Sequence, residues 1–320
     1  MILVGDIGGT NARFAIAIEA SGKKIIISDY EKFKSRDFDV FEDLLQGFIS
    51  SIDHKPSKAI LAVAGPVHDQ RAEFTNQNWE VNSRLIEKAC KIPKVHLIND
   101  FEAMARSVPE MSQKNFIEIN QGVVAENAPI LVAGPGTGFG ACLLIKQGTN
   151  WTPYATEGGH SIYAPQSDLE KEIVAYIGRD GTPVSVERLC AGKGLKDLTK
   201  AICEIKDVPY TDISPHELVE RSQSGEEPFL TVSLVRANMI MSSLANMALV
   251  TGARGGVVIS GGVAKHLANF LTSKEALDRF KAVWTHKNYL PNIPIKLLID
   301  STAPLIGAAA YGFYEGAQNG

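Results

Sequence analysis

The sequence predicts an α/β fold divided into two domains. Its 320 residues, 45% of them hydrophobic and 21% charged, can bury a core in each of about two domains. Near the start of each half, an apolar strand leads into a glycine-rich turn and a second apolar strand, over residues 2–18 and 130–145. Apolar strands then alternate with helical patterns, as in parallel sheets. The shared pattern suggests a duplicated unit, although the rest of the two halves shows no alignable identity.

The remaining elements are expected in a regular order. In the first half we expect a helix over 38–51, a strand over 59–64, a loop over 74–79, a strand over 95–98 and a helix over 101–108. Ser107-Val108-Pro109 ends that helix and is a candidate hinge between lobes. In the second half we expect a long buried helix over 229–249, capped near Gly252, a strand over 256–260, a helix opened by Gly261-Gly262 and a last helix over about 304–316.

Charge and composition exclude several classes of protein. The formal net charge is -4, and the 32 basic and 36 acidic residues are well mixed, so no basic stripe is available to bind nucleic acid. The N-terminus has no cationic leader, and the apolar stretch 239–250 is broken by polar residues, so neither export nor membrane insertion is expected. The cysteines show no paired spacing and are expected to be reduced thiols of a cytoplasmic protein: Cys90, Cys142, Cys190 and Cys203.

The two glycine-rich turns, Gly5 to Thr10 and Gly134 to Gly140, are candidate phosphate-binding loops. Without Cβ atoms in the way, backbone N–H groups can approach an anion closely. Asp6 can hold a hydrated Mg²⁺ ion, and Thr10 or Asn11 can donate hydrogen bonds to phosphate oxygens. A single turn of this kind could be an ordinary glycine hairpin, but two of them together favour a triphosphate ligand.

Other nucleotide-binding signatures do not fit. Gly136-x-Gly138-x-x-Ala141 matches the dinucleotide pattern, but an apolar strand follows it where that pattern requires a helix. The G-x-x-x-x-G-K-[ST] loop and the protein-kinase motifs are absent from the sequence. Phosphate binding is therefore expected on another fold.

Five motifs together identify a resemblance. They are Gly5-Asp6-Ile7-Gly8-Gly9-Thr10-Asn11-Ala12-Arg13, Leu97-Ile98-Asn99-Asp100-Phe101, Gly134-Pro135-Gly136-Thr137-Gly138, Glu157-Gly158-Gly159-His160 and Ser260-Gly261-Gly262-Val263. In this combination and order they resemble the bacterial glucokinase family, within the actin-like sugar kinases, over essentially the whole chain.

The resemblance implies a two-lobed actin-like fold with a ribonuclease-H-like mixed sheet, flanked by helices, in each lobe. The lobes would be 1–109 plus 301–320 and 110–300, with the active site in the cleft between them. It also implies an ATP:D-glucose 6-phosphotransferase that feeds glycolysis, and we keep a homodimer as the expected assembly. Glucose would be held by Asn99, Asp100, Glu157, His160 and Glu187. ATP would be bound by Gly5, Asp6, Ile7, Gly8, Gly9, Thr10, Asn11, Gly136, Thr137, Gly138, Gly261 and Gly262, with Mg²⁺ on Asp6 through water.

The predicted sugar site also makes chemical sense without the resemblance. Carboxylates accept hydrogen bonds from sugar hydroxyls, and an imidazole can donate or accept. Glu157 and His160 flank two glycines, so a tight turn can bring both side chains to one ligand. Alone, Glu187 would be read as a solvated helix residue and Asn99-Asp100 as a helix N-cap. Their occurrence together with two phosphate turns favours a site, in which Asp100 is the candidate general base for the sugar 6-hydroxyl.

Three alternatives stay open at this point. The first is a kinase for another hexose, such as mannose, fructose or N-acetylglucosamine. The second is a non-catalytic sugar sensor on the same fold, although neither terminus shows a helix-turn-helix that would give such a sensor an output. The third is an actin-like ATPase whose turnover does not depend on a hexose.

Overall fold

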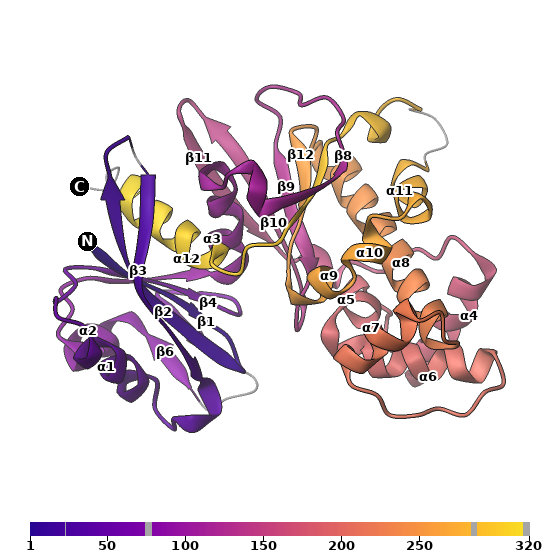
Figure 1. The fold of residues 1–320 in the computed structure, drawn as a ribbon, viewed down its shortest axis with the longest axis horizontal. Coiled ribbons are helices and arrows are strands. Elements are labelled where there is room, and N and C mark those ends of the chain that lie inside the picture. Colours follow the sequence, from indigo (N-terminus) through magenta and orange to yellow (C-terminus); the bar gives the residue numbers. More distant parts are fainter. Residues whose placement is uncertain (23, 74–78, 283–286, 316–320) are drawn as a thin grey trace. The chain divides into compact units, whose positions relative to one another are not determined.

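The computed structural model describes residues 1–22, 24–73, 79–282 and 287–315, which form two compact units (Figure 1). Unit 1 comprises Met1–Gln113, Lys146–Ala155 and Asp300–Gly320, and unit 2 comprises Lys114–Ile145 and Thr156–Ile299. Each unit is built on one mixed sheet flanked by helices, which confirms the predicted α/β class. The functional lobe boundaries near residues 109 and 301 stay a prediction.

The sheet of unit 1 has five strands in the order β3-β2-β1-β4-β7. Its strands are β1 (Ile2–Ile7), β2 (Asn11–Ala20), β3 (Lys24–Lys34), β4 (Ala59–Val63) and β7 (Val95–Asn99), and a two-stranded ribbon, β5 (Arg71–Glu73) and β6 (Glu80–Asn82), accompanies it. β1 and β3 run antiparallel to β2, whereas β4 and β7 run parallel to β1. The carboxyl ends of β1, β4 and β7 therefore lie at the same edge of the sheet, where ligands bind in α/β proteins.

The side chains of β1 point alternately to the two faces of this sheet, and different helices cover the two faces. The helices of unit 1 are α1 (Phe41–Ser51), α2 (Ser83–Cys90), α3 (Asp100–Ser107) and α12 (Ala303–Ala310). Leu3 and Ile7 pack with α1 and α2, and Ile2 and Val4 pack with α3 and α12 (Figure 1). Because side chains alternate along a strand, Asp6 points to the face covered by α3 and α12.

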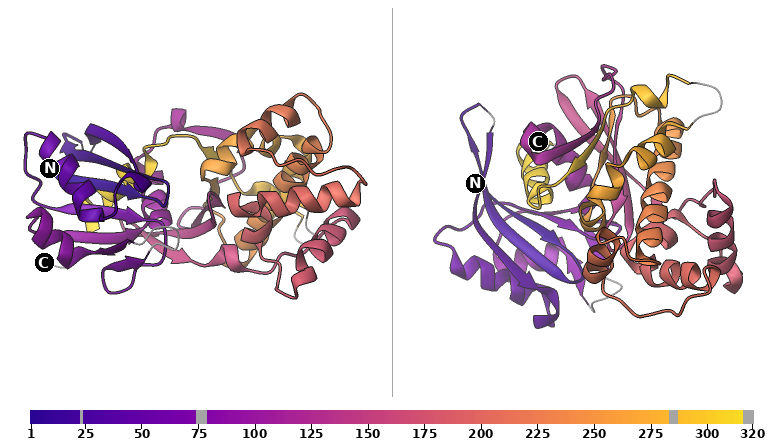
Figure 2. Two further views of the ribbon diagram at one scale, coloured as in Figure 1. Left: turned by 90° about the horizontal axis from the view of Figure 1, so that it is seen from below. Right: turned by 45° about the vertical axis from the view of Figure 1, so that its right-hand side comes forward.

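Helix α12 packs closely on α3 and β1, and both views in Figure 2 show it beside the sheet of unit 1. At Gly307 an added Cβ would lie 1.7 Å from the backbone oxygen of Ala103. Only a glycine allows the two helix backbones to approach this closely, because no side-chain rotation can relieve a clash with a carbonyl group. The C-terminal helix is thereby fixed against the helix that begins at Asp100.

We expect Gly307→Ala to lower the free energy of unfolding by at least about 3 kcal/mol, the upper part of the range for an overpacked core. The matched control is Gly47→Ala in α1, where an added Cβ meets nothing within 4 Å. This control should raise stability by about 0.5–1 kcal/mol, since alanine favours the helix over glycine. Denaturant unfolding followed by circular dichroism measures both changes. If Gly307→Ala unfolded at the same denaturant concentration as wild type, the close packing of α12 on α3 would be contradicted.

The second sheet has six strands in the order β11-β10-β9-β12-β13-β8, and it belongs to unit 2 except for nearly all of β11 and the end of β10, which fall within the unit 1 segment Lys146–Ala155. They are β8 (Phe116–Asn120), β9 (Ile130–Pro135), β10 (Phe139–Gln147), β11 (Asn150–Thr156), β12 (Gly256–Ile259) and β13 (Ile295–Leu298). β10 is antiparallel to β9, and β12 and β13 continue parallel to β9. The order β3-β2-β1-β4-β7 is thus repeated as β11-β10-β9-β12-β13, with β8 added at the edge, as the duplicated strand–turn–strand pattern suggests.

Unit 2 contains most of the helices. They are α4 (Asp168–Ile177), α5 (Val186–Cys190), α6 (Leu195–Ile205), α7 (Pro215–Gln223), α8 (Phe229–Thr251), α9 (Gly262–His266), α10 (Ala268–Leu271) and α11 (Lys274–Lys281). In the part of the chain that the structure describes, α8 alone is long and apolar enough to cross a membrane by length and composition, and 61% of its most apolar window is buried inside the structure. Buried core helices meet the same criterion, so α8 is weak support for a membrane span.

Most predicted elements are present, with shifted ends. The helix expected from residue 38 begins at Phe41, and the long helix ends at Thr251 with Gly252 in the left-handed conformation as its cap. Strand β3 and helices α4 to α7 were not predicted. Of the predicted loop 74–79, residues 74–78 lie outside the described residues. Trp79 is buried and donates a hydrogen bond from Nε1 to the Phe38 carbonyl oxygen.

Candidate active site

The first phosphate turn is shorter than predicted, because Gly5, Asp6 and Ile7 belong to β1 and Asn11 begins β2. The turn itself consists of Gly8, Gly9 and Thr10. It is closed by a hydrogen bond from Gly8 N to Asn11 O, 2.9 Å, and is held by Ser35, whose hydroxyl donates to Gly8 O at 2.8 Å. Ile7 is fully buried, so it can face a ligand only through its backbone.

Asp6 and Arg13 form an ion pair at the base of this turn. The two residues are direct partners across β1 and β2, which places their side chains on one face of the sheet. The side chain of Asp6 is 13% exposed. In the described part of the chain no group of three or more potential ligands could hold a metal ion. Mg²⁺ commonly keeps several waters and is bound through one or two carboxylates together with substrate phosphates, and water-mediated binding of Mg²⁺ by Asp6 stays a prediction.

Asn99 is the N-cap of α3, which confirms the helix N-cap that the sequence analysis considered at Asn99-Asp100. Its Oδ1 atom accepts hydrogen bonds from the N–H groups of Phe101 and Glu102, and the Glu102 side chain accepts from Asn99 N to complete a capping box. Nδ2 donates to the Gly65 carbonyl oxygen at 2.9 Å. These contacts fix the chain where β7 ends, and Nδ2 retains a second N–H for a ligand. A sugar-binding role for Asn99 stays a prediction.

Asp100 follows directly, as the first residue of α3. Burial of the carboxyl group, followed by repulsion from Asp6, raises the pKa of Asp100 to about 7, against a smaller opposing effect of the Phe101 N–H, which donates to Oδ1 at 2.9 Å. Both causes disfavour the charged form. A carboxylate with this pKa can accept a proton near neutral pH, whereas an ordinary aspartate is too weak a base.

The pH dependence of turnover should follow this shift. Proton acceptance needs ionised Asp100, so kcat/KM should fall about tenfold per pH unit below an apparent pKa of about 7. Asp6→Asn removes the negative charge that repels ionised Asp100, so the midpoint of the pH–rate profile should move to lower pH. This shift is expected independently of any change in the rate at the high-pH plateau. The exposed Asp43→Asn should leave the midpoint in place. A pH-independent rate between pH 5 and 8 would contradict this assignment.

The second phosphate turn lies in unit 2, between β9 and β10. Gly136 N donates to Gly138 O at 2.8 Å, and the next N–H, that of Phe139, donates to Oε2 of Glu187 at 2.8 Å. Gly261 lies against the same turn, since a Cβ there would be 2.3 Å from the Pro135 oxygen. The structure thus brings together the predicted phosphate-binding residues that follow β9 and β12 and one predicted sugar-binding carboxylate, Glu187.

Glu157 and His160 are placed side by side by a 3-10 turn, Gly158–His160. His160 N donates to Glu157 O at 3.0 Å, and the two side chains approach to 3.5 Å between Nε2 and Oε2. They are 78% and 62% exposed for Glu157 and His160 respectively, so both can reach a ligand. At Gly159 a Cβ would lie only 2.0 Å from the Phe139 oxygen, so the Gly158–His160 turn packs closely against the start of β10.

Sequence reasoning did not assign a role to Ser35 or Arg13, which hold the first turn. Arg13 could have been found from strand alternation, because it stands opposite Asp6 in the predicted hairpin. Ser35 lies 27 residues from its partner Gly8, and no local pattern connects them.

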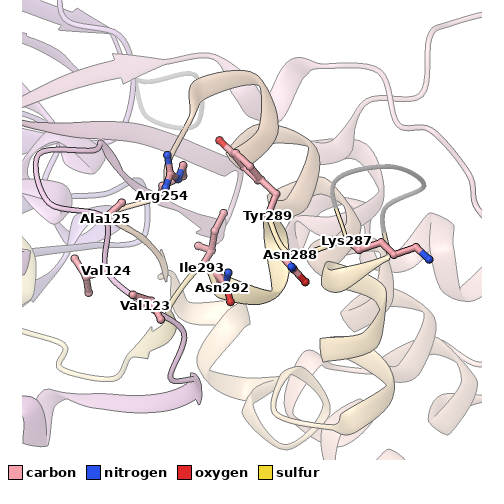
Figure 3. Close-up of a pocket in the computed structure, with 9 residues that line it drawn as sticks. All are labelled: Val123, Val124, Ala125, Arg254, Lys287, Asn288, Tyr289, Asn292 and Ile293. Carbon is pink, nitrogen blue, oxygen red and sulfur yellow. The ribbon is translucent and has the colours of Figure 1, made fainter.

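A pocket of about 770 Å³ lies elsewhere in unit 2 (Figure 3). Its lining residues precede β9, β12 and β13, so it lies at the opposite sheet edge from Gly136 and Gly261, which follow β9 and β12. The side chain of Lys287 points away from that of Arg254 in Figure 3, so the two cations do not converge on one ligand. The lining consists of Val123, Val124, Ala125, Arg254, Lys287, Asn288, Tyr289, Asn292 and Ile293, none of which was predicted as a site residue.

Comparison with known proteins gives a consistent result. The model of the Glucokinase family matches residues 3–313. Glucokinase from Caulobacter sp. (strain K31) is 34% identical over 309 residues, which cover 96% of this chain and 93% of that protein. Glucokinase from Saccharophagus degradans is 30% identical and covered over 97% of both chains.

Among solved structures, glucokinase from an Antarctic psychrotroph matches with a TM-score of 0.84 at 31% identity, over 97% of both chains. Glucokinase from Balamuthia mandrillaris, solved in complex with glucose, matches with a TM-score of 0.82 at 20% identity, over 97% of this chain and 92% of that one, and at this identity shows a shared fold. The predicted actin-like sugar-kinase fold is thus confirmed. Because the family model and these relatives extend over nearly the whole chain, the chain belongs to the glucokinase family of sugar kinases.

Proposed function

We propose that this protein transfers the γ-phosphoryl group of ATP to the 6-hydroxyl of glucose. The observation that carries the proposal is the position of Asp100. Its carboxyl group has a pKa of about 7 and is repelled by Asp6, which lies in the last part of β1, the strand that leads into the first glycine-rich turn. A proton acceptor of this strength beside a phosphate-binding turn suits phosphoryl transfer to an alcohol.

Asp100 would accept the proton of the 6-hydroxyl as that oxygen attacks the γ-phosphorus. Phosphoryl transfer needs little covalent help, so positioning and electrostatic stabilisation supply most of the rate. The raised pKa of Asp100 serves this role, because about half of the carboxyl groups are ionised at pH 7 and the ionised form binds a proton more strongly than an ordinary carboxylate does.

The glycine turns would bind the phosphates through backbone N–H groups. Gly8 to Thr10 in unit 1, and Gly136 to Gly138 with Gly261 and Gly262 in unit 2, are the segments that we assign to ATP. Asp6 would hold Mg²⁺ through water, and the bound ion would neutralise charge on the phosphate oxygens. Asp6 is paired with Arg13, its direct partner on β2, and this ion pair holds the carboxylate on the same face of the sheet as the guanidinium group.

Glu157, His160 and Glu187 would read the sugar hydroxyls, with Asn99 donating its second amide N–H. A sugar with a missing or inverted hydroxyl leaves one of these carboxylates or the imidazole without a hydrogen-bond partner. The cost of that lost partner makes the site selective among sugars. Glu187 also accepts the Phe139 N–H through Oε2, so its other oxygen, Oε1, is the atom that we assign to the hexose. The proposal further includes a cytoplasmic location and a homodimer.

The test is a substrate panel with coupled detection of ADP. Purified protein with Mg·ATP should turn over rapidly with glucose, and at least about tenfold less efficiently in kcat/KM with mannose or fructose. A higher efficiency with mannose, fructose or N-acetylglucosamine would assign the site to that hexose. Hexose-independent ATP turnover would favour an actin-like ATPase, and glucose binding without turnover would favour a sugar sensor.

A further inference from the structure

Arg236, in the middle of α8, is a buried cation that the proposed reaction does not use. Its side chain is 3% exposed. In the described part of the chain no carboxylate lies within ion-pair distance of its guanidinium group. Burial lowers the pKa of Arg236 to about 10, so the group is still charged at neutral pH. A buried, unpaired guanidinium is costly, and an apolar side chain would pack in its place without that cost.

The partners of Arg236 are two successive backbone carbonyls at the end of α5. Nε donates to Cys190 O at 3.0 Å, and Nη2 donates to Ala191 O at 2.7 Å. Helix α5 contains Glu187, and Ala191 N donates back to Glu187 O at 2.9 Å. The planar, forked guanidinium can hold both carbonyls at once, which a lysine ammonium group cannot do with the same geometry. Arg236 therefore fixes the end of the short helix that positions Glu187.

The segment held by Arg236 also contacts the second phosphate turn. Gly192 N donates to Gly136 O at 2.9 Å, and Lys193 N donates to Thr137 O at 3.3 Å. At the other end of the segment, Oε2 of Glu187 accepts the Phe139 N–H. Residues 187–193 thus contact the turn from Gly136 to Phe139 at two places. Arg236 binds the carbonyls of Cys190 and Ala191, which lie between these two places in the chain.

We propose that Arg236 is a positioning residue that holds residues 187–193 against the Gly136–Phe139 turn, so that the hexose and the nucleotide are bound by one rigid segment of unit 2. The inference rests on the proposed function, since it takes Glu187 as a sugar ligand and the turn as a phosphate ligand. Without the guanidinium, the end of α5 is free to move away from α8. Glu187 and the phosphate turn then both lose their fixed positions.

The test compares Arg236→Met, Arg236→Lys and a matched control, Leu244→Ala, which opens a cavity under the same helix at a fully buried position. We expect Arg236→Met to raise KM for both ATP and glucose and to lower kcat/KM for each at least tenfold, as misplacement of binding groups by about 1 Å can cost about a hundredfold. Arg236→Lys should recover part of the loss. Leu244→Ala should lower the melting temperature and leave both KM values within about threefold of wild type.

If Arg236→Met retains wild-type KM values, or if its KM values shift no more than those of Leu244→Ala, the inference is wrong. Should Arg236→Met not fold, Arg236→Lys decides by the same criterion. Binding of a fluorescent ATP analogue, measured without hexose, separates the inference from the proposed function. Wild-type protein that binds the analogue but does not phosphorylate glucose would refute the function alone. Equal analogue affinity of wild type and folded Arg236 variants would refute the inference alone.

Discussion

Asp100→Asn is expected to lower kcat with glucose by at least about a hundredfold while ATP and glucose still bind. General-base catalysis typically contributes about 10²–10⁴-fold, and the amide cannot accept the proton of the 6-hydroxyl. The amide is nearly isosteric and keeps Oδ1 as an acceptor for the Phe101 N–H, so the start of α3 is preserved. Steady-state kinetics with coupled ADP detection, together with calorimetric titration of glucose, separates the loss of kcat from a loss of binding.

The stability of this variant should change in the opposite direction to its activity. The folded-state pKa of Asp100, about 7, lies above the ordinary aspartate pKa of 3.8, so the ionised carboxylate destabilises the folded state above pH 7, and this penalty disappears as the pH falls towards 3.8. Asparagine has no such charge. Asp100→Asn should therefore melt at a higher temperature than wild type at pH 8, with a smaller gain at pH 5.

The matched control for Asp100→Asn is Glu102→Gln on the same helix. Its side-chain oxygen can still accept the hydrogen bond from Asn99 N, so kcat should stay within about threefold of wild type. Retention of more than about a tenth of wild-type kcat by Asp100→Asn would remove Asp100 from the role of general base, because this is well inside the smallest effect expected.

Gly159→Ala should lower kcat/KM for glucose by about a hundredfold or more. Its Cβ would lie 2.0 Å from the Phe139 oxygen and 2.9 Å from the Phe139 Cβ, so the Gly158–His160 turn must move away from β10. The Glu157 and His160 side chains move with that turn, and a displacement of about 1 Å of a positioning group can cost about a hundredfold. KM for glucose should rise more than KM for ATP.

The neighbouring Gly158→Ala is the control for this prediction. The three atoms nearest to a Cβ at Gly158 belong to side chains: the Ala141 Cβ and the Met247 Cε at 3.3 Å, and the Met247 Sδ at 3.4 Å. Because the thioether can shift, we expect kcat/KM for glucose within about fivefold of wild type. Equal effects of the two substitutions would show that the position of the turn on Phe139 does not control sugar binding.

The strands and turns of both glycine-rich hairpins could be predicted from the sequence, because apolar runs on either side of a glycine cluster have few alternative structures. The long helix α8 and its glycine cap were predicted for a similar reason, since a sustained helical period ended by Gly252 is a local signal. Strand β3 was missed because its burial alternates weakly and charged residues occupy much of its length. Local patterns fail where a strand lies at the edge of a sheet.

The sequence by itself determined the α/β class, the two hairpins and the kinds of side chain that the site requires, since these depend on local spacing and residue chemistry. Only the tertiary structure decided the chemical state and the neighbours of those side chains. The raised pKa of Asp100 depends on burial of its carboxyl group in the folded chain and on repulsion from Asp6, 94 positions earlier in the numbering. The contact of Arg236 with Cys190 and Ala191 likewise requires α8 to pack on α5. Electrostatics and close packing act through space, and therefore become defined only when the chain is folded.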